Sequence, residues 1–319
     1  LFQGFNDKKV LIVGDAMIDA YMWGEVNRMS PEAPVPVVEI QKHENRLGGA
    51  ANVALNLIAL GAKPILCSLI GTGNRGIIFD NLMQEAKLST AGILCTNKRK
   101  TTIKTRVIAG NKHQLRIDEE ETSPILQVEE FLNLTISLMN DIDVIILQDY
   151  NKGVLTPKII EGVIVSANKK GIPTIVDPKK LNFNSYKNCT IFKPNLAEIK
   201  AGMKVDFDIN NMAEIEKVTA KLRKQLSAKG ILLTLSEKGI CFNSENKFIH
   251  NQAFKRNIID VSGAGDTVLS VASLCLASSM DYPDLSILSS LAGGIVCEEV
   301  GVVPINKEKL LTQALKHIS

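Results

Sequence analysis

Residues 259–267 read Ile-Asp-Val-Ser-Gly-Ala-Gly-Asp-Thr and lead directly into an apolar segment, 268–279. The small residues 263–265 leave the backbone bare of bulky side chains, and the apolar segment predicts a helix that begins beside them. Free N–H groups and the positive end of the helix dipole would therefore coincide there and favour an anion. Asp266 would lie in the first turn, where its carboxylate can take a proton from a nucleophilic hydroxyl. This combination indicates phosphoryl transfer.

A structural alternative is open for the same residues. Ser and Asp are ordinary N-cap residues, so Ser262 or Asp266 could serve only to cap a buried helix. Other parts of the chain have to distinguish the two interpretations.

The composition is that of an ordinary globular protein. With 319 residues, 45% of them hydrophobic and 22% charged, the chain is long enough for one large α/β domain. A net charge of +3, with Lys and Arg spread along the chain, gives no indication of a nucleic-acid partner. The six cysteines have no C-x-x-C spacing and the four histidines are scattered, which indicates reduced thiols and no zinc site.

The chain shows no membrane or export signal. No apolar run reaches the roughly 18 residues that a membrane span needs, and no cleavable apolar leader is present. We therefore expect a cytoplasmic protein without a membrane partner. The first four residues, Leu-Phe-Gln-Gly, resemble the remnant of a protease cleavage site, so the expected domain covers residues 5–319.

Short apolar runs alternate with helical patterns along most of the chain. The first run, 10–13, ends at a Gly-Asp pair, as expected for a buried parallel strand. Similar runs follow at 64–70, 144–147, 174–176 and 231–234. Their alternation with helices predicts a doubly wound α/β fold with a mostly parallel sheet.

Two segments depart from this pattern and predict a small β lid, formed by residues of about 16–47 and 98–118. Three prolines between residues 31 and 36 exclude a central strand, so the region 20–41 should be a loop followed by an edge or flap strand. Segments 101–108 and 114–118 alternate apolar and polar residues and should form an antiparallel hairpin.

A glycine motif at residues 71–76, Gly-Thr-Gly-Asn-Arg-Gly, raises a different possibility. It fits G-x-G-x-x-G between a strand and a helix, the context of a dinucleotide site and hence of an NAD(P)-binding oxidoreductase. The acid expected after the next strand is missing, because Thr-Asn-Lys-Arg stands at 96–99. The first strand also lacks a glycine-rich turn, so this interpretation is disfavoured.

Polar residues at the ends of early strands could bind a sugar. Asp15 and Asp19 follow the first strand, where open α/β sheets bind ligands, and carboxylates accept hydrogen bonds from neighbouring hydroxyls. Gly48 and Gly49 would let the backbone approach a ligand, and Asn52 adds an amide. A capped turn explains each of these equally well when it is taken alone.

Later strand ends could hold a nucleotide. Asn195 and Glu198 lie three residues apart at a helix start and could orient a hydrated Mg²⁺, although Asn-x-x-Glu is also a capping pair. Thr234, Ser236 and Gly239 end another strand with small groups that suit a nucleotide wall or simply a turn.

Charged residues on the lid and after a central strand complete the candidate set. Cations on a closing lid could hold an anionic substrate or neutralise a transferring phosphoryl group, although a solvated strand face is the more ordinary explanation. The candidates are Lys104, Arg106 and Arg116 on the lid, and Asp149 and Lys152 after the strand.

The two glycine-containing signatures, at residues 48–52 and 260–267, resemble those of the ribokinase-like (PfkB) sugar kinases, and the resemblance covers nearly the whole chain from about residue 8. Within that family, the segments 28–37, 114–118, 149–153 and 176–179 are similar to the kinase part of bacterial heptose-7-phosphate kinases. The resemblance implies transfer of the ATP γ-phosphate to the anomeric hydroxyl of D-glycero-D-manno-heptose 7-phosphate. The product would be heptose 1,7-bisphosphate, a precursor of the ADP-heptose of lipopolysaccharide cores.

The resemblance also implies roles for individual residues. Asp266 would be the general base, and Gly263, Ala264 and Gly265 would form the anion hole. Asp15, Gly49 and Asn52 would bind the sugar, and Asn195 with Glu198 would position Mg²⁺ and phosphate. Thr234, Ser236 and Gly239 would border ATP. The family has an acid where this chain has Asn74, so that position receives no role.

Further expectations follow from the same resemblance. They include Mg²⁺ with ATP, room for a monovalent cation such as K⁺, and a homodimer formed through the lid. Bifunctional relatives carry a nucleotidyltransferase domain after the kinase; since this chain ends at Ser319, we expect no second activity in it. The alternatives that stay open are a kinase of the same fold for fructose, ribose or a fructose phosphate, and a binding protein that kept the fold without activity.

Overall fold

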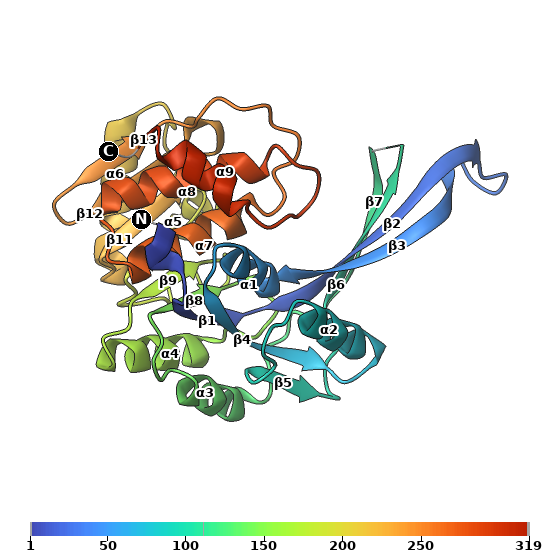
Figure 1. The fold of residues 1–319 in the computed structure, drawn as a ribbon, viewed down its shortest axis with the longest axis horizontal. Coiled ribbons are helices and arrows are strands. Elements are labelled where there is room, and N and C mark those ends of the chain that lie inside the picture. Colours follow the sequence, from blue (N-terminus) through green and yellow to red (C-terminus); the bar gives the residue numbers. More distant parts are fainter. Residues whose placement is uncertain (1, 111, 318–319) are drawn as a thin grey trace.

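A nine-stranded sheet forms the centre of the computed structural model, which describes residues 2–110 and 112–317 (Figure 1). Its strand order is β13-β12-β11-β10-β9-β8-β1-β4-β5, with parallel pairing from β11 to β5 and antiparallel pairing of β12 and β13 at one edge. The strands are β1 (Lys9–Gly14), β4 (Lys63–Gly71), β5 (Ile93–Thr96), β8 (Val144–Gln148), β9 (Thr174–Asp177), β10 (Ile191–Phe192), β11 (Gly230–Thr234), β12 (Ile240–Ser244) and β13 (Phe248–Asn251). The predicted doubly wound, mostly parallel sheet is confirmed.

Helices cover both faces of this sheet (Figure 1). Alternate residues of a strand enter opposite cores: Val10 and Ile12 of β1 pack into one apolar cluster, and Leu11 and Val13 into the other. Both faces are buried, which explains why the strands read as continuous apolar runs. The helices are α1 (Ala50–Ala59), α2 (Asn74–Glu85), α3 (Val128–Ser137), α4 (Pro157–Lys169), α5 (Leu196–Met203), α6 (Met212–Leu226), α7 (Ala264–Ala277), α8 (Tyr282–Val296) and α9 (Lys307–Ala314).

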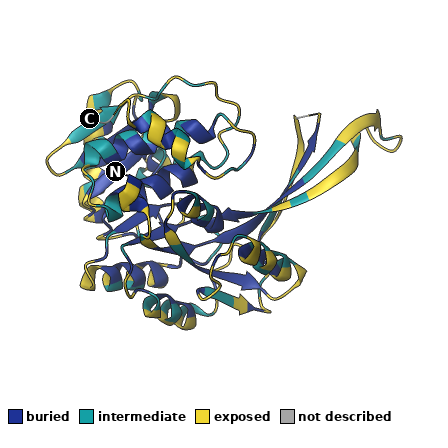
Figure 2. Ribbon diagram, viewed as in Figure 1, coloured by how far each residue is buried: buried dark blue, intermediate teal, exposed yellow. Residues whose placement is uncertain are grey.

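A second sheet of four strands protrudes from the body as the lid (Figures 1 and 2). Its order is β3-β2-β6-β7, formed by β2 (Ala16–Met29), β3 (Pro36–Gly49), β6 (Ile103–Ala109) and β7 (Lys112–Glu119). The antiparallel hairpin predicted from alternation is β6 with β7. The prediction of a loop at the start of the 20–41 region was wrong: β2 continues to Met29, because two of the three prolines lie in the turn at the tip and the third only starts β3.

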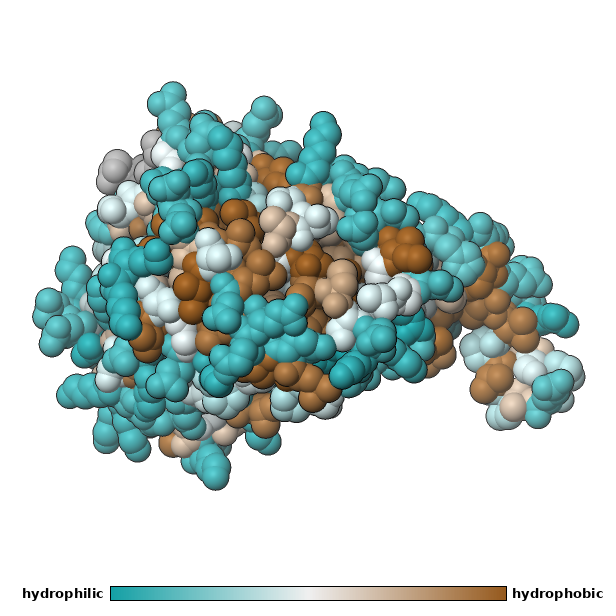
Figure 3. Space-filling view, turned by 90° about the horizontal axis from the view of Figure 1, so that it is seen from below, coloured by the Kyte–Doolittle hydropathy of each residue, from teal (hydrophilic) through white to brown (hydrophobic). Residues whose placement is uncertain are grey.

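The protruding end of the lid exposes apolar side chains (Figure 3). They come from both of its long hairpins and include Val26, Met29, Ile40, Leu115 and Ile117. Near the body the same sheet is buried, as Ile18 and Leu47 show. The lid is thus anchored at its base and free at its tip (Figure 2).

The chain begins with a short 3₁₀ helix, Phe2–Phe5. Phe2 and Phe5 are both buried and belong to the apolar cluster under α7 and α8. Phe2 lies in the segment that was expected to stand outside the fold, and in this structure it packs against the core. None of the described helices is long and apolar enough to cross a bilayer.

Candidate active site

The turn before α7 has the open backbone that the sequence predicted. Gly263 is the N-cap residue, with φ of 81°, a left-handed conformation that favours glycine, and no side chain caps the helix. Asp260 holds the turn by accepting hydrogen bonds from the N–H groups of Ser262 and Gly301, both at 2.9 Å. A side chain added at Gly265 would meet no atom within 4 Å, so the first turn of α7 faces open space.

Asp266 does not cap the helix; its carboxylate lies in a buried hydrogen-bond network. Its Oδ2 accepts a bond from Asn52 Nδ2 at 2.7 Å, and its Oδ1 accepts bonds from the Tyr150 hydroxyl at 2.7 Å and from Gln148 Nε2 at 3.2 Å. Burial raises the pKa of Asp266 to about 6, although the bonds from Asn52 and Tyr150 lower it. A carboxyl with this pKa is ionised at neutral pH and is a better base than an ordinary aspartate.

Two buried acceptors border this carboxylate. Asn52 Oδ1 and Gln148 Oε1 have no hydrogen-bond partner among the described residues, although both side chains are almost fully buried. Buried acceptors of this kind are costly unless a ligand or water satisfies them. Together with the second lone pair of Asp266 Oδ2, they form a set of oxygens suited to the hydroxyls of a polyol.

A second carboxylate continues the network behind Asp266. Gln148 Nε2 also donates to Asp177 Oδ2 at 3.1 Å, and Asp177 Oδ1 pairs with Lys193 Nζ at 3.0 Å. Lys193 is only 2% exposed, so this ion pair lies in the interior. A buried ammonium and a buried carboxylate are thus joined to Asp266 through the side chain of Gln148.

Asn195 and Glu198 form the capping pair that the sequence left as an alternative to metal binding. Asn195 Oδ1 accepts from the Glu198 N–H at 2.9 Å, and Glu198 Oε2 accepts from the Asn195 N–H at 2.8 Å, at the start of α5. Glu198 Oε1 pairs with Lys179 Nζ, and this ammonium lies 5.6 Å from the centre of the Tyr150 ring. Asn195 and Glu198 therefore cap α5 and also lie next to the Asp266 network.

The predicted nucleotide wall lies beside this capping pair. Asn195 bridges to Thr234 at the end of β11, so the two strand ends are adjacent. Ser236 is exposed in the short 3₁₀ turn that follows, and Gly239 closes the turn before β12. The predicted nucleotide wall, Thr234, Ser236 and Gly239, therefore lies where β11 ends and the chain turns into β12.

The two aspartates near β1 and β8 hold the backbone in place. Asp15 is buried and accepts hydrogen bonds from the N–H groups of Tyr150, Lys152 and Val154, between 2.9 and 3.0 Å. Burial raises the pKa of Asp15. Asp149 accepts a bond from the buried Tyr186 hydroxyl at 2.7 Å. This geometry gives Asp149 a structural role and does not support the predicted contact with substrate, because its carboxylate points into the core.

The cations predicted on the lid and after β8 are paired with acids. Lys104 contacts Asp118 and Glu120, each at 2.9 Å, and Lys152 contacts Glu120 at 2.7 Å. The further pairs are Arg116 with Asp118, and Arg106 with the buried Asp19. Gly48 and Gly49 end β3 directly opposite Met17 and Ala16, next to Asp19.

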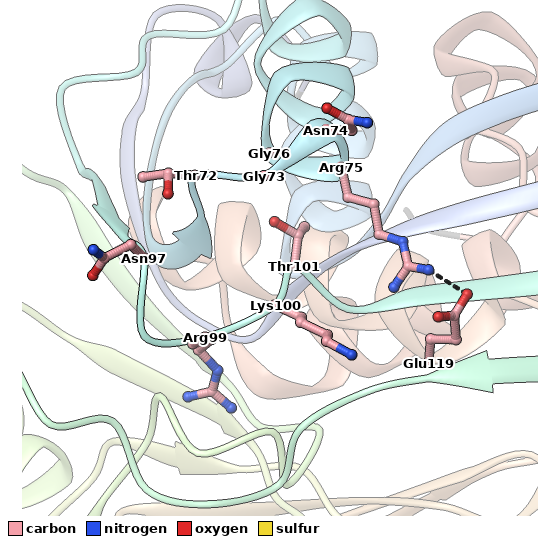
Figure 4. A pocket seen from close by; sticks show the side chains of 10 residues that line it. All are labelled: Thr72, Gly73, Asn74, Arg75, Gly76, Asn97, Arg99, Lys100, Thr101 and Glu119. Carbon is pink, nitrogen blue, oxygen red and sulfur yellow. Dashed lines mark ion pairs between the residues drawn. The ribbon is translucent and has the colours of Figure 1, made fainter.

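The predicted glycine motif lines a pocket of about 450 Å³ (Figure 4). Its lining comes from the turn between β4 and α2, from residues 97–101 and from Glu119. A nicotinamide cofactor would need an acid for its ribose, and the only carboxylate among the lining residues is already paired with Arg75. The pocket therefore gives the dinucleotide interpretation no support.

Sequence reasoning missed part of the network around Asp266. Gln148, Tyr150, Asp177 and Lys193 received no role, although three of them stand at or just after the ends of apolar strands. Polar residues at the carboxyl ends of parallel strands are the signal that could have identified them.

Residues 7–309 match the pfkB family of carbohydrate kinases. The chain belongs to this family. The kinase is also 40% identical, over 97% of its length, to the bifunctional protein HldE of Desulfatibacillum aliphaticivorans, and 36% identical, over 95% of its length, to HldE of Helicobacter pylori strain P12. It spans 63% and 66% of the lengths of these relatives. The prediction of a sugar kinase, a phosphotransferase with an alcohol acceptor, is confirmed.

Solved structures agree on the fold of the kinase. It superposes on ribokinase of Arabidopsis thaliana, complexed with ribose and ATP, with a TM-score of 0.76 at 17% identity, covering 97% of this chain and 99% of that one. It superposes on phosphofructokinase-2 of Escherichia coli, in complex with potassium, with a TM-score of 0.78 at 17% identity and the same coverage. The ribokinase-like fold is thus confirmed.

Proposed function

We propose that the kinase transfers the γ-phosphate of ATP to the anomeric hydroxyl of D-glycero-D-manno-heptose 7-phosphate and yields heptose 1,7-bisphosphate, a precursor of the ADP-heptose of lipopolysaccharide cores. The observation that carries the chemistry is the buried Asp266 carboxylate at the N-terminus of α7, with a pKa of about 6. Family membership supports a sugar as acceptor. Similarity to the HldE proteins, and the segments that resemble heptose-7-phosphate kinases, support the heptose.

The proton of the acceptor hydroxyl moves to Asp266 Oδ2 in this proposal. Oδ1 is already bound by Tyr150 and Gln148, whereas Oδ2 has a single donor, Asn52, and retains a lone pair. Asn52 Oδ1 accepts a hydrogen bond from a neighbouring hydroxyl of the sugar. This bond orients the attacking oxygen. The hydroxyl oxygen then attacks phosphorus in line as the bond to ADP breaks, with the N–H groups of the α7 turn, at Gly263, Ala264 and Gly265, stabilising the phosphoryl oxygens.

The residues on the nucleotide side suit Mg²⁺. Asp177 and Glu198 supply carboxylate oxygens, and Asn195 an amide oxygen, the hard ligands that Mg²⁺ takes directly or through water. Asn195 and Glu198 would hold the ion through water, and it would neutralise charge on the ATP phosphates. Thr234, Ser236 and Gly239 would border the nucleotide. A requirement for K⁺ is supported only by the potassium complex of phosphofructokinase-2.

Two further properties belong to this proposal. The exposed apolar tip of the lid supports a homodimer in which two lids pair. The described cysteines are all unpaired and mostly buried, which supports a reducing compartment such as the cytoplasm.

A phosphorylation panel tests the acceptor. With saturating Mg·ATP, kcat/KM should be highest for D-glycero-D-manno-heptose 7-phosphate when compared with fructose 6-phosphate, fructose and ribose. Phosphorus NMR of the product should place the new phosphate on C1. Turnover of free hexoses without any turnover of heptose 7-phosphate would contradict the assignment.

A further inference from the structure

The pocket at the glycine motif has no part in the chemistry at Asp266, and the proposed function assigns it no ligand. It measures about 450 Å³ and lies where the β4–α2 turn, residues 97–101 and the lid strand β7 meet (Figure 4). Its lining residues are Thr72, Gly73, Asn74, Arg75, Gly76, Asn97, Arg99, Lys100, Thr101 and Glu119.

Close packing explains two of the three glycines in the motif. A Cβ at Gly76 would lie 1.8 Å from the Gly71 carbonyl oxygen, and a Cβ at Gly71 would lie 2.3 Å from the Arg99 carbonyl oxygen. Any side chain there would displace the backbone that frames the pocket. A Cβ at Gly73 would meet nothing within 4 Å, so this third position opens onto free space at the start of α2.

Cations outnumber acids in the pocket. Arg75 pairs with Glu119, but Arg99 and Lys100 have no carboxylate within ion-pair distance among the residues described in the structure (Figure 4). The Arg99 guanidinium instead donates to the carbonyl oxygens of Glu121, at 2.7 Å, and Lys152. Burial lowers the pKa of Arg99, although the charges of Glu121 and Asp15 raise it.

The cations that the sequence predicted on the lid and after β8 differ in this respect. Lys104 and Lys152 are neutralised by Asp118 and Glu120. An incoming anion would have to compete with these carboxylates, whereas Lys100 and Arg99 form no direct ion pair with a carboxylate of the described residues.

The pocket lies at a suitable distance from the reacting group. Gly71 ends β4, and β1 separates β4 from β8, whose last residue, Gln148, contacts Asp266. Two strand spacings amount to about 10 Å. A sugar of six or seven carbons spans a comparable distance between its anomeric hydroxyl and a phosphate at the far end of its chain. The bond from Arg99 to the Lys152 carbonyl links the two regions directly.

We propose that this pocket binds the terminal phosphate of a sugar phosphate, with Lys100 and Arg75 as its contacts and Arg99 as the fixed charge in its wall. The inference rests on the proposed function and deepens it, because it makes a phosphomonoester, rather than a free sugar, the acceptor that the kinase selects.

Matched substrates test the subsite. The kinase, Lys100→Met and Arg75→Met are each assayed with D-glycero-D-manno-heptose 7-phosphate and with the same heptose lacking phosphate. Each variant should lower kcat/KM for the phosphorylated sugar roughly 10- to 100-fold, the cost of a lost charged hydrogen bond, and leave kcat/KM for the free sugar unchanged. Lys98→Met, an exposed lysine outside the pocket, should change neither value. Equal losses for both sugars, or no loss in either variant, would overturn the proposal.

A binding measurement separates the subsite from the proposed function. Inorganic phosphate is titrated into the kinase and into Lys100→Met in a calorimeter, which needs no turnover. Weaker phosphate binding by the variant supports the subsite even if heptose 7-phosphate proves not to be the substrate. Identical phosphate binding by the two proteins overturns the subsite even if heptose 7-phosphate is turned over.

Discussion

At the scale of the residue, the two oxygens of Asp266 have different surroundings. Oδ1 is bound by Tyr150 and Gln148, which fix the orientation of the carboxylate, and Oδ2 keeps a lone pair for the substrate. Burial raises the pKa to about 6, which makes the carboxylate more basic while it stays ionised at neutral pH.

The pH dependence of turnover follows from that pKa. A general base has to be deprotonated, so kcat/KM should rise with pH through about 6 and level off above it. Below the inflexion, activity should fall about tenfold for each pH unit. A pH series with a phosphorylatable sugar measures this; a profile that stays flat from pH 5 to pH 8 would be inconsistent with Asp266 as the titrating base.

Removal of the Tyr150 hydroxyl should shift this profile. The hydrogen bond from Tyr150 stabilises the ionised carboxylate and lowers its pKa, so Tyr150→Phe should move the inflexion to higher pH. Tyr282→Phe is the matched control, because Tyr282 stacks on Phe242 and is not among the described hydrogen-bond donors to the Asp266 carboxylate. An unchanged inflexion in Tyr150→Phe, despite a normal fold, would show that the hydroxyl does not act on the base.

At the scale of the element, the ends of neighbouring strands are joined by buried polar contacts. Gln148 at the end of β8 contacts Asp177 at the end of β9, and Asp177 pairs with Lys193, which follows β10. The network therefore connects three adjacent strands to Asp266 on α7. A buried pair of this kind is costly to break, since one unpaired charge would remain in the interior.

Lys193→Met should consequently destabilise the protein by about 3–5 kcal/mol, because it leaves Asp177 buried without its partner. Urea unfolding followed by circular dichroism measures the change. Lys200→Met, which breaks the exposed pair with Asp206, should cost less than about 1 kcal/mol. Similar midpoints for both variants would mean that the interior pair contributes no more than a surface pair.

Most helices and strands could be predicted from the sequence, but only part of the site could. The physical reasons differ between the two. The apolar runs of β1, β4 and β8 are read easily because both faces of each strand are buried. The strand nature of β2 was missed because Pro31, Pro34 and Pro36 suggested a loop, although they lie at or beyond the tip. Gln148 and Lys193 were missed because their function depends on neighbours that come from distant parts of the chain.

At the scale of the whole molecule, the site combines groups far apart in sequence. The fold brings three such groups into contact: Asn52 on α1, Tyr150 after β8 and Asp266 on α7. They meet because the carboxyl ends of the parallel strands lie along one edge of the sheet. The lid extends from the same edge, since β2 starts immediately after Asp15. Its base contributes to the site, and its tip presents an apolar surface to solvent (Figures 2 and 3).

The exposed tip predicts a dimer that a single charge should weaken. Sedimentation at micromolar concentration should give twice the mass of the chain, and Leu115→Lys should shift the protein toward the monomer because it places a charge in the apolar patch. Leu181→Lys, at an exposed apolar residue of the body, should leave the dimer intact. A monomer before any substitution would contradict assembly through the lid.

The role of Asp266 as the base is tested most directly by Asp266→Asn, with turnover and binding measured on the same preparation. We expect kcat to fall on the order of 10² to 10⁴-fold, while calorimetry should find that the variant still binds Mg·ATP and the sugar phosphate. Asp80→Asn, at a half-buried aspartate of α2 that bonds only to Gln84 on the same helix, should retain full turnover. A near-normal kcat in Asp266→Asn would show that Asp266 is not the general base.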